Sequence, residues 1–232
     1  VFIAMRYWHP FSSETVADEI GMNHDDFCKE LEIARQKLLA VRSRRIRPLL
    51  DDKILTSWNS LMISAMAKAG RVLEDTDRIE KSTKAMEFLL AQLRTSDGKM
   101  LRRYREGEAR YDGYLFDHSA TAVACLDIYE ATYDTRYIQI AKELMQRVVE
   151  KFSSDGGAFY ETANDAEELL VRQISGSDGV EPSGNSSSAL AFLKLSAYLG
   201  DSELTKKAEN IFLSFNDELM EYGINSAYML QA

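Results

Sequence analysis

The sequence lacks a long apolar run and has few histidines, cysteines, prolines and glycines. Even its longer apolar stretches, such as residues 138–144, are short and contain polar side chains, here Gln139 and Lys142. A membrane span needs about 20 consecutive apolar residues. No charged segment followed by an apolar one opens the chain, so we expect no leader peptide. These absences predict a soluble protein that does not associate with membranes.

The scarcity of histidine and cysteine bears on metal binding. His9, His24 and His118 are the only histidines, and Cys28 and Cys125 lie far apart in the sequence. These residues show no usual zinc-ligand spacing, so we expect no metal site and no cofactor. Two lone thiols in a chain without a leader are typical of a reduced, cytoplasmic protein.

The balance of charges argues against one class of partner. Thirty-seven acidic and 28 basic residues give a net charge of −9. This negative charge is unfavourable for a general nucleic-acid binder. The composition, 45% hydrophobic and 28% charged, is ordinary for a globular protein and excludes a disordered one.

Three prolines and twelve glycines supply few turn signals, which favours long helices over a many-stranded sheet. Apolar residues recur at intervals of three and four along seven segments. We predict helices over residues 25–47, 54–69, 79–93, 117–131, 135–152, 183–199 and 202–220. Short strands over residues 99–105 and 108–115 should form a hairpin around Gly107, and a second extended segment should pass through residues 155–161.

The predicted helices repeat as hairpins. The second, fourth and sixth helices begin near residues 54, 117 and 183, and a tight acidic turn and a partner helix follow each one. Repeated hairpins bury their apolar faces by stacking on one another. We therefore predict an all-α fold, an α/α toroid with short β-hairpin excursions, in which these three helices form the inner layer. Residues 23–232 are assigned to the toroid domain, and residues 1–22 form an N-terminal segment that we cannot place.

The most unusual polar motifs occur where the three inner helices begin. Alternate helices in an array of hairpins run parallel, so these starts should lie at one end of the domain. The motifs occupy residues 47–59, 114–118 and 178–185. Three polar clusters that meet on one rim predict a pocket.

Two of these motifs carry a resemblance to a known family. They are RPLLDDKILTSWN, at residues 47–59, and PSGNS, at residues 182–186. In this order they resemble the spermatogenesis-associated protein 20 family, whose bacterial members are described as thioredoxin-domain-containing proteins of unknown function. The similarity runs over about residues 30–230. It implies an (α/α)6 toroid of the six-hairpin glycosidase and N-acylglucosamine epimerase type, which the family joins to a thioredoxin-like domain.

The chain also departs from the family. It contains no Cys-x-x-Cys pair, so we expect the thioredoxin-like domain to be missing. Family members look like Leu-Glu-Asp-Tyr-Ala where residues 115–119 read LFDHS. Seven helices are fewer than the twelve of a complete toroid, so we expect a partial toroid. The open flanks of a partial toroid would be apolar. Because identical chains commonly cover such patches by pairing, we expect a homo-oligomer.

Carboxylates from different rim segments are the candidate catalytic groups, because glycoside hydrolysis uses two carboxyl groups that flank one bond. A histidine beside one of them would form a proton-transfer pair. The catalytic candidates are Asp52, Asp117, His118 and Asp178. The candidate substrate-binding residues are Asp51, Trp58, Asn59, Glu181, Ser183 and Asn185.

Each candidate also has a structural interpretation. Asp51, Asp52, Asp117, Ser183 and Asn185 stand where helices begin, and such residues cap helices. Trp58 could pack in the core of the array instead of facing a sugar ring. The sequence leaves these alternatives open.

Two classes of function follow. The first is a domain that binds or processes a small carbohydrate in the rim pocket, and it leaves open whether the chain is an enzyme. Epimerase chemistry would need two histidines across a sugar, and only His118 is placed for it. The second is a non-catalytic helical scaffold that supports a thioredoxin-like domain or a partner protein.

Overall fold

The computed structural model describes residues 12–167 and 169–232. The chain divides into two compact units, Val1–Asp51 and Asp52–Ala232.

The described part of the first unit contains two helices, α2 (Ser13–Glu19) and α3 (His24–Ser43). Ser12 begins α2 by accepting a hydrogen bond from the Thr15 backbone N–H, and Asn23 begins α3 by accepting one from Asp25. Within α3, Phe27 is buried. The apolar residues that predicted this helix are largely exposed, namely Leu31, Leu38 and Val41. The division of the chain after Asp51 therefore places α3 outside the unit with the hairpins, whereas the sequence placed the boundary after residue 22.

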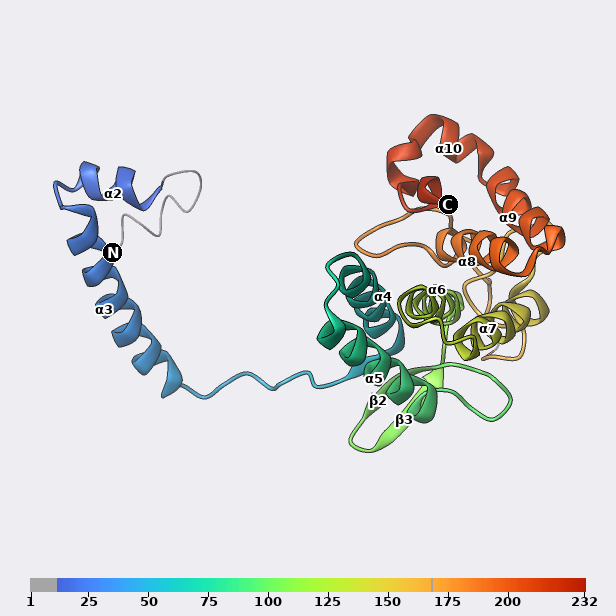
Figure 1. Ribbon diagram of the computed structural model, residues 1–232, viewed down its shortest axis with the longest axis horizontal. Coiled ribbons are helices and arrows are strands. Elements are labelled where there is room, and N and C mark those ends of the chain that lie inside the picture. The colour runs from blue at the N-terminus through green and yellow to red at the C-terminus, as the bar shows by residue number, and fades with distance from the viewer. Residues whose placement is uncertain (1–11, 168) are drawn as a thin grey trace. The chain divides into compact units, whose positions relative to one another are not determined.

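The second unit is an array of three helical hairpins (Figure 1). The first hairpin pairs α4 (Thr56–Val72) with α5 (Thr76–Gln92). The second pairs α6 (Leu115–Thr132) with α7 (Arg136–Phe152), and the third pairs α8 (Gly184–Leu199) with α9 (Ser202–Ser214). Helices α4, α6 and α8 pack successively against one another. These are the helices that the sequence predicted as the inner layer.

Burial distinguishes the inner helix α6 from its outer partner α7. Every residue of α6 from Leu115 to Ile128 is buried. A helix that is apolar and buried on all sides is typical of a core position. Helix α7 buries one face, which recurs at intervals of three and four: Tyr137, Ala141, Leu144, Met145, Val148 and Phe152. The prediction that the fourth helix is more buried than the fifth is confirmed.

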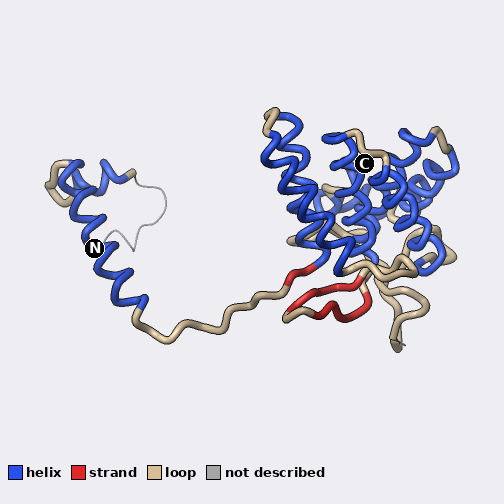
Figure 2. The backbone as a smooth tube through the Cα atoms, turned by 60° about the horizontal axis from the view of Figure 1, so that its bottom comes forward, coloured by secondary structure: helices blue, strands red, loops and turns tan. Residues whose placement is uncertain are grey.

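A small antiparallel sheet lies at the end of the array where α4 begins (Figure 2). Its order is β1 (Ile54–Leu55), β2 (Leu101–Arg105) and β3 (Glu108–Asp112). In the β2–β3 register, Arg103 pairs with Arg110. The turn uses positive φ angles at Glu106 and Gly107, as a tight hairpin requires. The predicted hairpin is confirmed, while β1 forms where the sequence predicted the start of a helix.

The predicted last helix is interrupted. Helix α9 ends at Ser214, and a short helix α10 (Asn216–Tyr222) follows after Phe215. Phe215 is buried and belongs to the core cluster. Two 3-10 turns close the chain, η1 (Gly223–Ser226) and η2 (Met229–Gln231).

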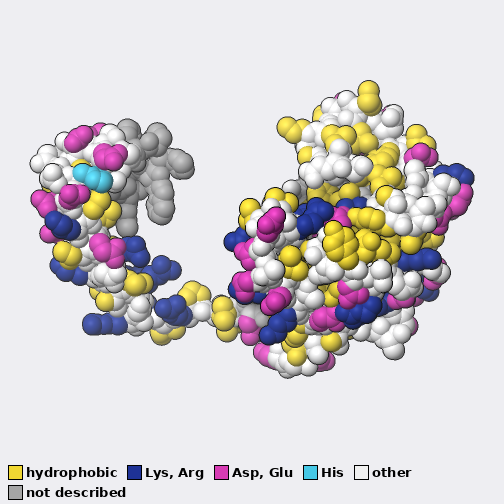
Figure 3. Space-filling view, in the orientation of Figure 1, with side chains coloured by type: hydrophobic (Ala, Val, Ile, Leu, Met, Phe, Trp, Pro, Cys, Tyr) yellow, Lys and Arg dark blue, Asp and Glu magenta, His cyan; other side chains and the backbone are white. Residues whose placement is uncertain are grey.

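Hydrophobic side chains gather on one face of the second unit over its later helices (Figure 3). Those most exposed on the C-terminal elements are Leu213, Met220 and Ile224. Within the described residues, no helix combines the length and apolar character that crossing a bilayer requires. Self-association through an open flank stays a prediction.

Candidate functional site

The starts of the three inner helices meet at one end of the second unit. The Asp117 carboxylate of α6 accepts a hydrogen bond from the Ser57 backbone N–H in the first turn of α4, at 3.1 Å. Gly184 of α8 lies so close to α6 that a Cβ there would come within 2.7 Å of Leu115 Cγ. The rim that the polar motifs predicted is therefore formed by real contacts between these helices.

Asp117 is buried, with 1% of its surface exposed. Besides Ser57, its second carboxylate oxygen accepts from the Tyr114 backbone N–H at 2.9 Å and lies 3.5 Å from Arg102 Nη1. Burial raises the pKa of Asp117 to about 6, although these donors partly offset the shift. The carboxylate thus joins α4, α6 and β2, which is the structural role that the sequence left open.

His118 is buried next to Asp117 but faces a different set of atoms. Its Nε2 accepts from the Met100 backbone N–H at 3.1 Å, and its Nδ1 lies 3.0 Å from the Tyr114 carbonyl oxygen. These contacts suit a neutral ring that carries its proton on Nδ1. Burial lowers the pKa of His118 to about 4. Both ring nitrogens bond the backbone, so the imidazole serves the fold.

The polar residues before α8 are also bonded to the backbone. Asp178 accepts from the Ser183 N–H at 2.8 Å and from the Tyr228 N–H at 2.7 Å. Ser183 is the N-cap of α8. Asn185 is completely buried; its Oδ1 accepts from the Phe159 N–H, and its Nδ2 donates to the carbonyls of Phe159 and Ser175, each at 2.9 Å. These residues hold loops against the start of α8.

The acidic pair before α4 does not cap that helix. Leu55 is the N-cap, and it has no capping side chain. Asp52 is exposed and pairs with Arg105 at 2.6 Å. Asp51 is exposed and ends the first unit. Asn59 donates to the Leu55 carbonyl at 2.8 Å, one turn back in the helix. The predicted roles of Asp51 and Asp52 toward a substrate stay predictions.

Trp58 is not a core residue, because 61% of its surface is exposed. Its Nε1–H donates to Glu181 Oε2 at 3.0 Å. The two side chains line an open groove of about 300 Å³ together with Leu61 and Val180. The structure therefore brings two of the predicted binding residues together, whereas Asp52, Asp117 and Asn185 are not among the residues that line this groove.

A second cavity, of about 580 Å³, lies where α6 begins. It is lined by Tyr114, Glu161, Thr162, Leu169, Leu170, Val171 and Gln173. Burial raises the pKa of Glu161 to about 7. Glu161 is not among the residues predicted from the sequence, because it occurs in an irregular loop with no motif around it. The predicted extended segment Phe159-Tyr160-Glu161 contains this residue, but nothing in that segment singles out the carboxyl group.

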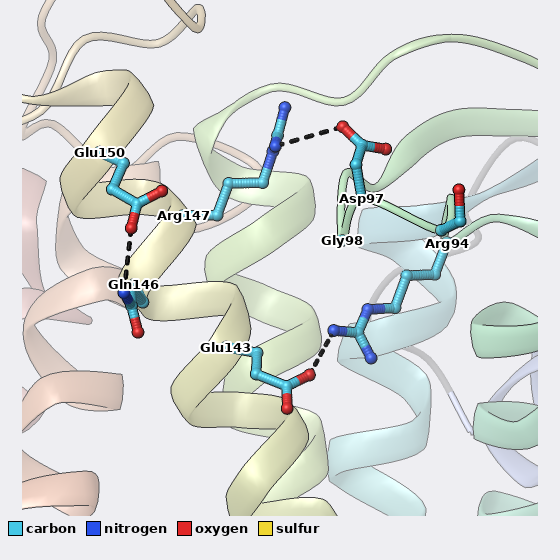
Figure 4. A pocket seen from close by; sticks show the side chains of 8 residues that line it. Arg94, Asp97, Gly98, Glu143, Gln146, Arg147 and Glu150 are labelled. Carbon is cyan, nitrogen blue, oxygen red and sulfur yellow. Dashed lines mark hydrogen bonds and ion pairs between the residues drawn. The ribbon is translucent and has the colours of Figure 1, made fainter.

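A third groove is lined by charged residues of α7 and of the turn before β2 (Figure 4). Arg94 pairs with Glu143 at 2.6 Å, and Arg147 lies 3.5 Å from Asp97 and 3.3 Å from Asp165. These charges already neutralise one another, so this groove connects α7 to its neighbours. Across residues 12–167 and 169–232, no group of three or more His, Cys, Asp or Glu side chains is placed to hold a metal ion.

Comparison with known sequences supports the resemblance. The chain is 28% identical to human spermatogenesis-associated protein 20 over 233 residues, which cover 96% of this chain and 30% of that protein. The protein of the same name from Mus musculus is 28% identical over 221 residues, 90% of this chain and 28% of that protein. The chain therefore spans less than a third of the length of these relatives. No family model matches the sequence.

Comparison with solved structures supports the fold. A GH76 α-mannanase from Bacteroides thetaiotaomicron superposes with a TM-score of 0.62 at 15% identity, over 79% of this chain and 53% of the mannanase. Cellobiose 2-epimerase from Spirochaeta thermophila gives 0.58 at 13% identity, over 72% and 44%. A family 105 glycoside hydrolase from C. acetobutylicum gives 0.57 at 15% identity, over 89% and 61%. The chain is thus similar in sequence to the spermatogenesis-associated protein 20 proteins, and its three hairpins have the fold of part of an α/α toroid of the six-hairpin glycosidase type.

Proposed function

We propose that the second unit binds a small carbohydrate in the groove formed by Trp58, Leu61, Val180 and Glu181. The observation that carries this proposal is the indole of Trp58, which stays exposed on an inner helix while Glu181 fixes its nitrogen. An exposed indole has a large apolar face that suits the C–H face of a sugar ring. The Glu181 carboxylate adds an acceptor for sugar hydroxyl groups beside that face.

Two further observations support a sugar as the ligand. The groove lies at the start of α4, on the rim where the inner helices meet. The proteins with a similar fold include a mannanase and a cellobiose epimerase by name. Hydrolysis would need two carboxyl groups about 5–9.5 Å apart across the scissile bond. Among the described residues, Glu181 is the one carboxyl group that lines this groove, so binding is the function that the geometry supports.

The scaffold alternative has an observation in its favour. Three catalytic candidates from the sequence form hydrogen bonds with backbone groups, namely Asp117, His118 and Asp178. A domain that holds a partner protein needs such rigidity and no catalytic group. The two functions differ in whether a sugar binds.

Titration calorimetry with cellobiose and mannobiose tests the proposal on the 232-residue chain. We expect millimolar or tighter binding of one of them, and a loss of at least about tenfold in Trp58→Ala. Glu181→Gln should weaken binding less, because the amide oxygen still accepts hydrogen bonds. Leu213→Ala is the matched control, since it removes another exposed apolar side chain on α9. Absence of binding, or equal binding by Trp58→Ala, would refute the proposal and favour the scaffold.

A further inference from the structure

The cavity at the start of α6 is separate in its lining from the Trp58 groove. Its floor is held by two backbone hydrogen bonds: the Leu115 N–H donates to the Glu161 carbonyl at 2.9 Å, and the Glu161 N–H donates to the Gln173 carbonyl at 2.8 Å. These bonds fix the Glu161 backbone between the start of α6 and Gln173, which lies later in the same loop. The side chain of Glu161 is therefore presented to the cavity from an anchored backbone.

The carboxyl group of Glu161 has no partner in the described part of the chain. No hydrogen bond or ion pair reaches it there, and burial is the single cause of its raised pKa. The neighbouring guanidinium groups point elsewhere. Arg172 donates to the Thr162 carbonyl and lies over the Tyr160 ring, and Arg102 lies over the Tyr114 ring. A partly buried carboxyl group without a donor is costly unless something else supplies one.

A second polar group beside Glu161 is also unused. The hydroxyl of Thr162 is buried and has no hydrogen-bond partner among the described residues. Native proteins leave few buried polar groups unsatisfied, and such groups often mark the place of a ligand. The cavity thus presents the Glu161 carboxyl group without a partner, and the unpartnered Thr162 hydroxyl lies buried in the neighbouring residue.

Other lining residues of the cavity are apolar. Leu169, Leu170 and Val171 follow one another in the chain and are exposed, Leu170 completely so. Three consecutive exposed aliphatic side chains are unfavourable in water and are typical of a surface that a ligand covers. Unlike the Trp58 groove, these side chains offer no indole to stack on a sugar, so a neutral polyol fits them poorly.

The Glu161 carboxyl group and the apolar side chains together define the chemistry of the ligand. We propose that this cavity binds a small organic cation, in which an ammonium group pairs with the Glu161 carboxylate and an apolar body covers Leu169, Leu170 and Val171. The ammonium group supplies the charge and the donors that Glu161 lacks. An anion would meet the carboxylate, and an alcohol would leave it without a counter-charge.

Binding of a cation has a consequence for protons. The ammonium group stabilises the charged form of Glu161, so the carboxylic acid loses its proton to the solvent as the complex forms. The ligand keeps its own proton. Because burial raises the pKa of Glu161 to about 7, binding near neutral pH should release a fraction of a proton.

Calorimetry with hexylammonium, hexanol and hexanoate tests the proposal at pH 7 in two buffers of different ionisation enthalpy. We expect hexylammonium to bind at least about tenfold more tightly than hexanol, hexanoate not to bind, and the heat to depend on the buffer. In Glu161→Gln, hexylammonium should bind no better than hexanol, and the buffer dependence should disappear.

Two further variants make the outcome decisive. Glu167→Gln removes an exposed carboxylate from the same loop and should leave binding unchanged. Leu170→Ser changes a fully exposed side chain, so it should fold normally and weaken binding several-fold. The proposal is overturned if hexylammonium fails to bind, binds like hexanol, or responds equally to Glu161→Gln and Glu167→Gln. Sugar binding at Trp58 is measured on the same variants, and its presence or absence has no bearing on this result.

Discussion

Polar groups at one end of the second unit differ in whether the fold itself satisfies them. Those at the starts of α6 and α8 differ in this respect from those around the Trp58 groove and the Glu161 cavity. At the helix starts, Asp117, His118 and Asn185 are buried and bonded to the backbone on every side. Around the cavities, the Trp58 indole is exposed and the Glu161 carboxyl group has no partner within the described residues. The comparison teaches that residue type and position on a rim do not identify a binding group. At Glu161 the distinguishing feature is the unused carboxyl group, whereas at Trp58 it is the exposed indole face, because the indole N–H is bonded to Glu181.

The largest effect that sharpens this comparison is expected at Asp117. Asp117→Ala leaves the Ser57 and Tyr114 N–H groups without acceptors at a buried junction, so unfolding should become easier by about 3–5 kcal/mol. Asp117→Asn keeps one acceptor and should cost about 1–3 kcal/mol. Urea unfolding measures both. Asp52→Asn is the control, since Asp52 forms an exposed ion pair worth about 1 kcal/mol or less. An Asp117→Ala variant as stable as this control would break the comparison.

Asn185→Ala should have the next largest effect. The substitution removes three hydrogen bonds to the backbone at Phe159 and Ser175. We expect a loss of about 2–4 kcal/mol in the free energy of unfolding. Asn216→Ala, at an exposed position of α10, provides the matched control and should change stability by less than about 0.5 kcal/mol. If both variants behave alike, Asn185 does not hold the loops.

Glu161→Gln should act in the opposite direction and depend on pH. The folded pKa of Glu161 is raised to about 7 from 4.5, so the folded state holds this proton more tightly than the unfolded state. Its stabilising contribution is complete below pH 4.5 and is lost as the pH rises through 7. Glu161→Gln should therefore match the parent near pH 4.5 and be more stable at pH 8 by on the order of 2 kcal/mol. Chemical unfolding at both pH values checks this. A variant that is less stable at pH 8 would show that Glu161 is a structural carboxylate.

The smallest effect on stability is expected at Trp58. Because its indole is mostly exposed, Trp58→Ala should change the free energy of unfolding by about 1 kcal/mol or less, while it removes sugar binding. Thermal unfolding with and without cellobiose or mannobiose separates the two effects. A loss of several kcal/mol would assign Trp58 to the core and remove it from the proposed site.

The sequence predicted the fold well because periodicity and repetition report burial directly. The inner helices α4, α6 and α8 and the β2–β3 hairpin lie where apolar spacing and Gly107 indicated them. The strand β1 was missed because its pairing partner, Tyr104, is 50 positions away in the chain. The break at Phe215 was missed because it depends on a long-range contact, between Phe215 and Gly176.

The contacts of the candidate site residues could be predicted from the sequence only in part. Trp58 and Glu181 were selected for their types, and the structure brings them together. Asp117 and His118 looked like a catalytic pair because they are neighbours in sequence, but each faces other atoms. Glu161 was missed because its importance arises from burial in an irregular loop. A sequence shows which polar groups are present, but it does not show which of them form hydrogen bonds within the folded protein.

The three hydrogen bonds of Asn185 affect the conformational entropy that ligand binding would cost. They fasten residues 159 and 175 to one point of α8, and Glu161 and Glu181 extend from the same two segments. Asn185 therefore anchors the two segments that lead to these glutamates. The conformational entropy of these loops is largely lost on folding, so little of it remains to be lost on binding. In Asn185→Ala the loops would keep more conformational freedom, which binding would then have to remove. The Trp58 groove and the Glu161 cavity should therefore both bind ligands more weakly, although neither loses a residue that contacts the ligand.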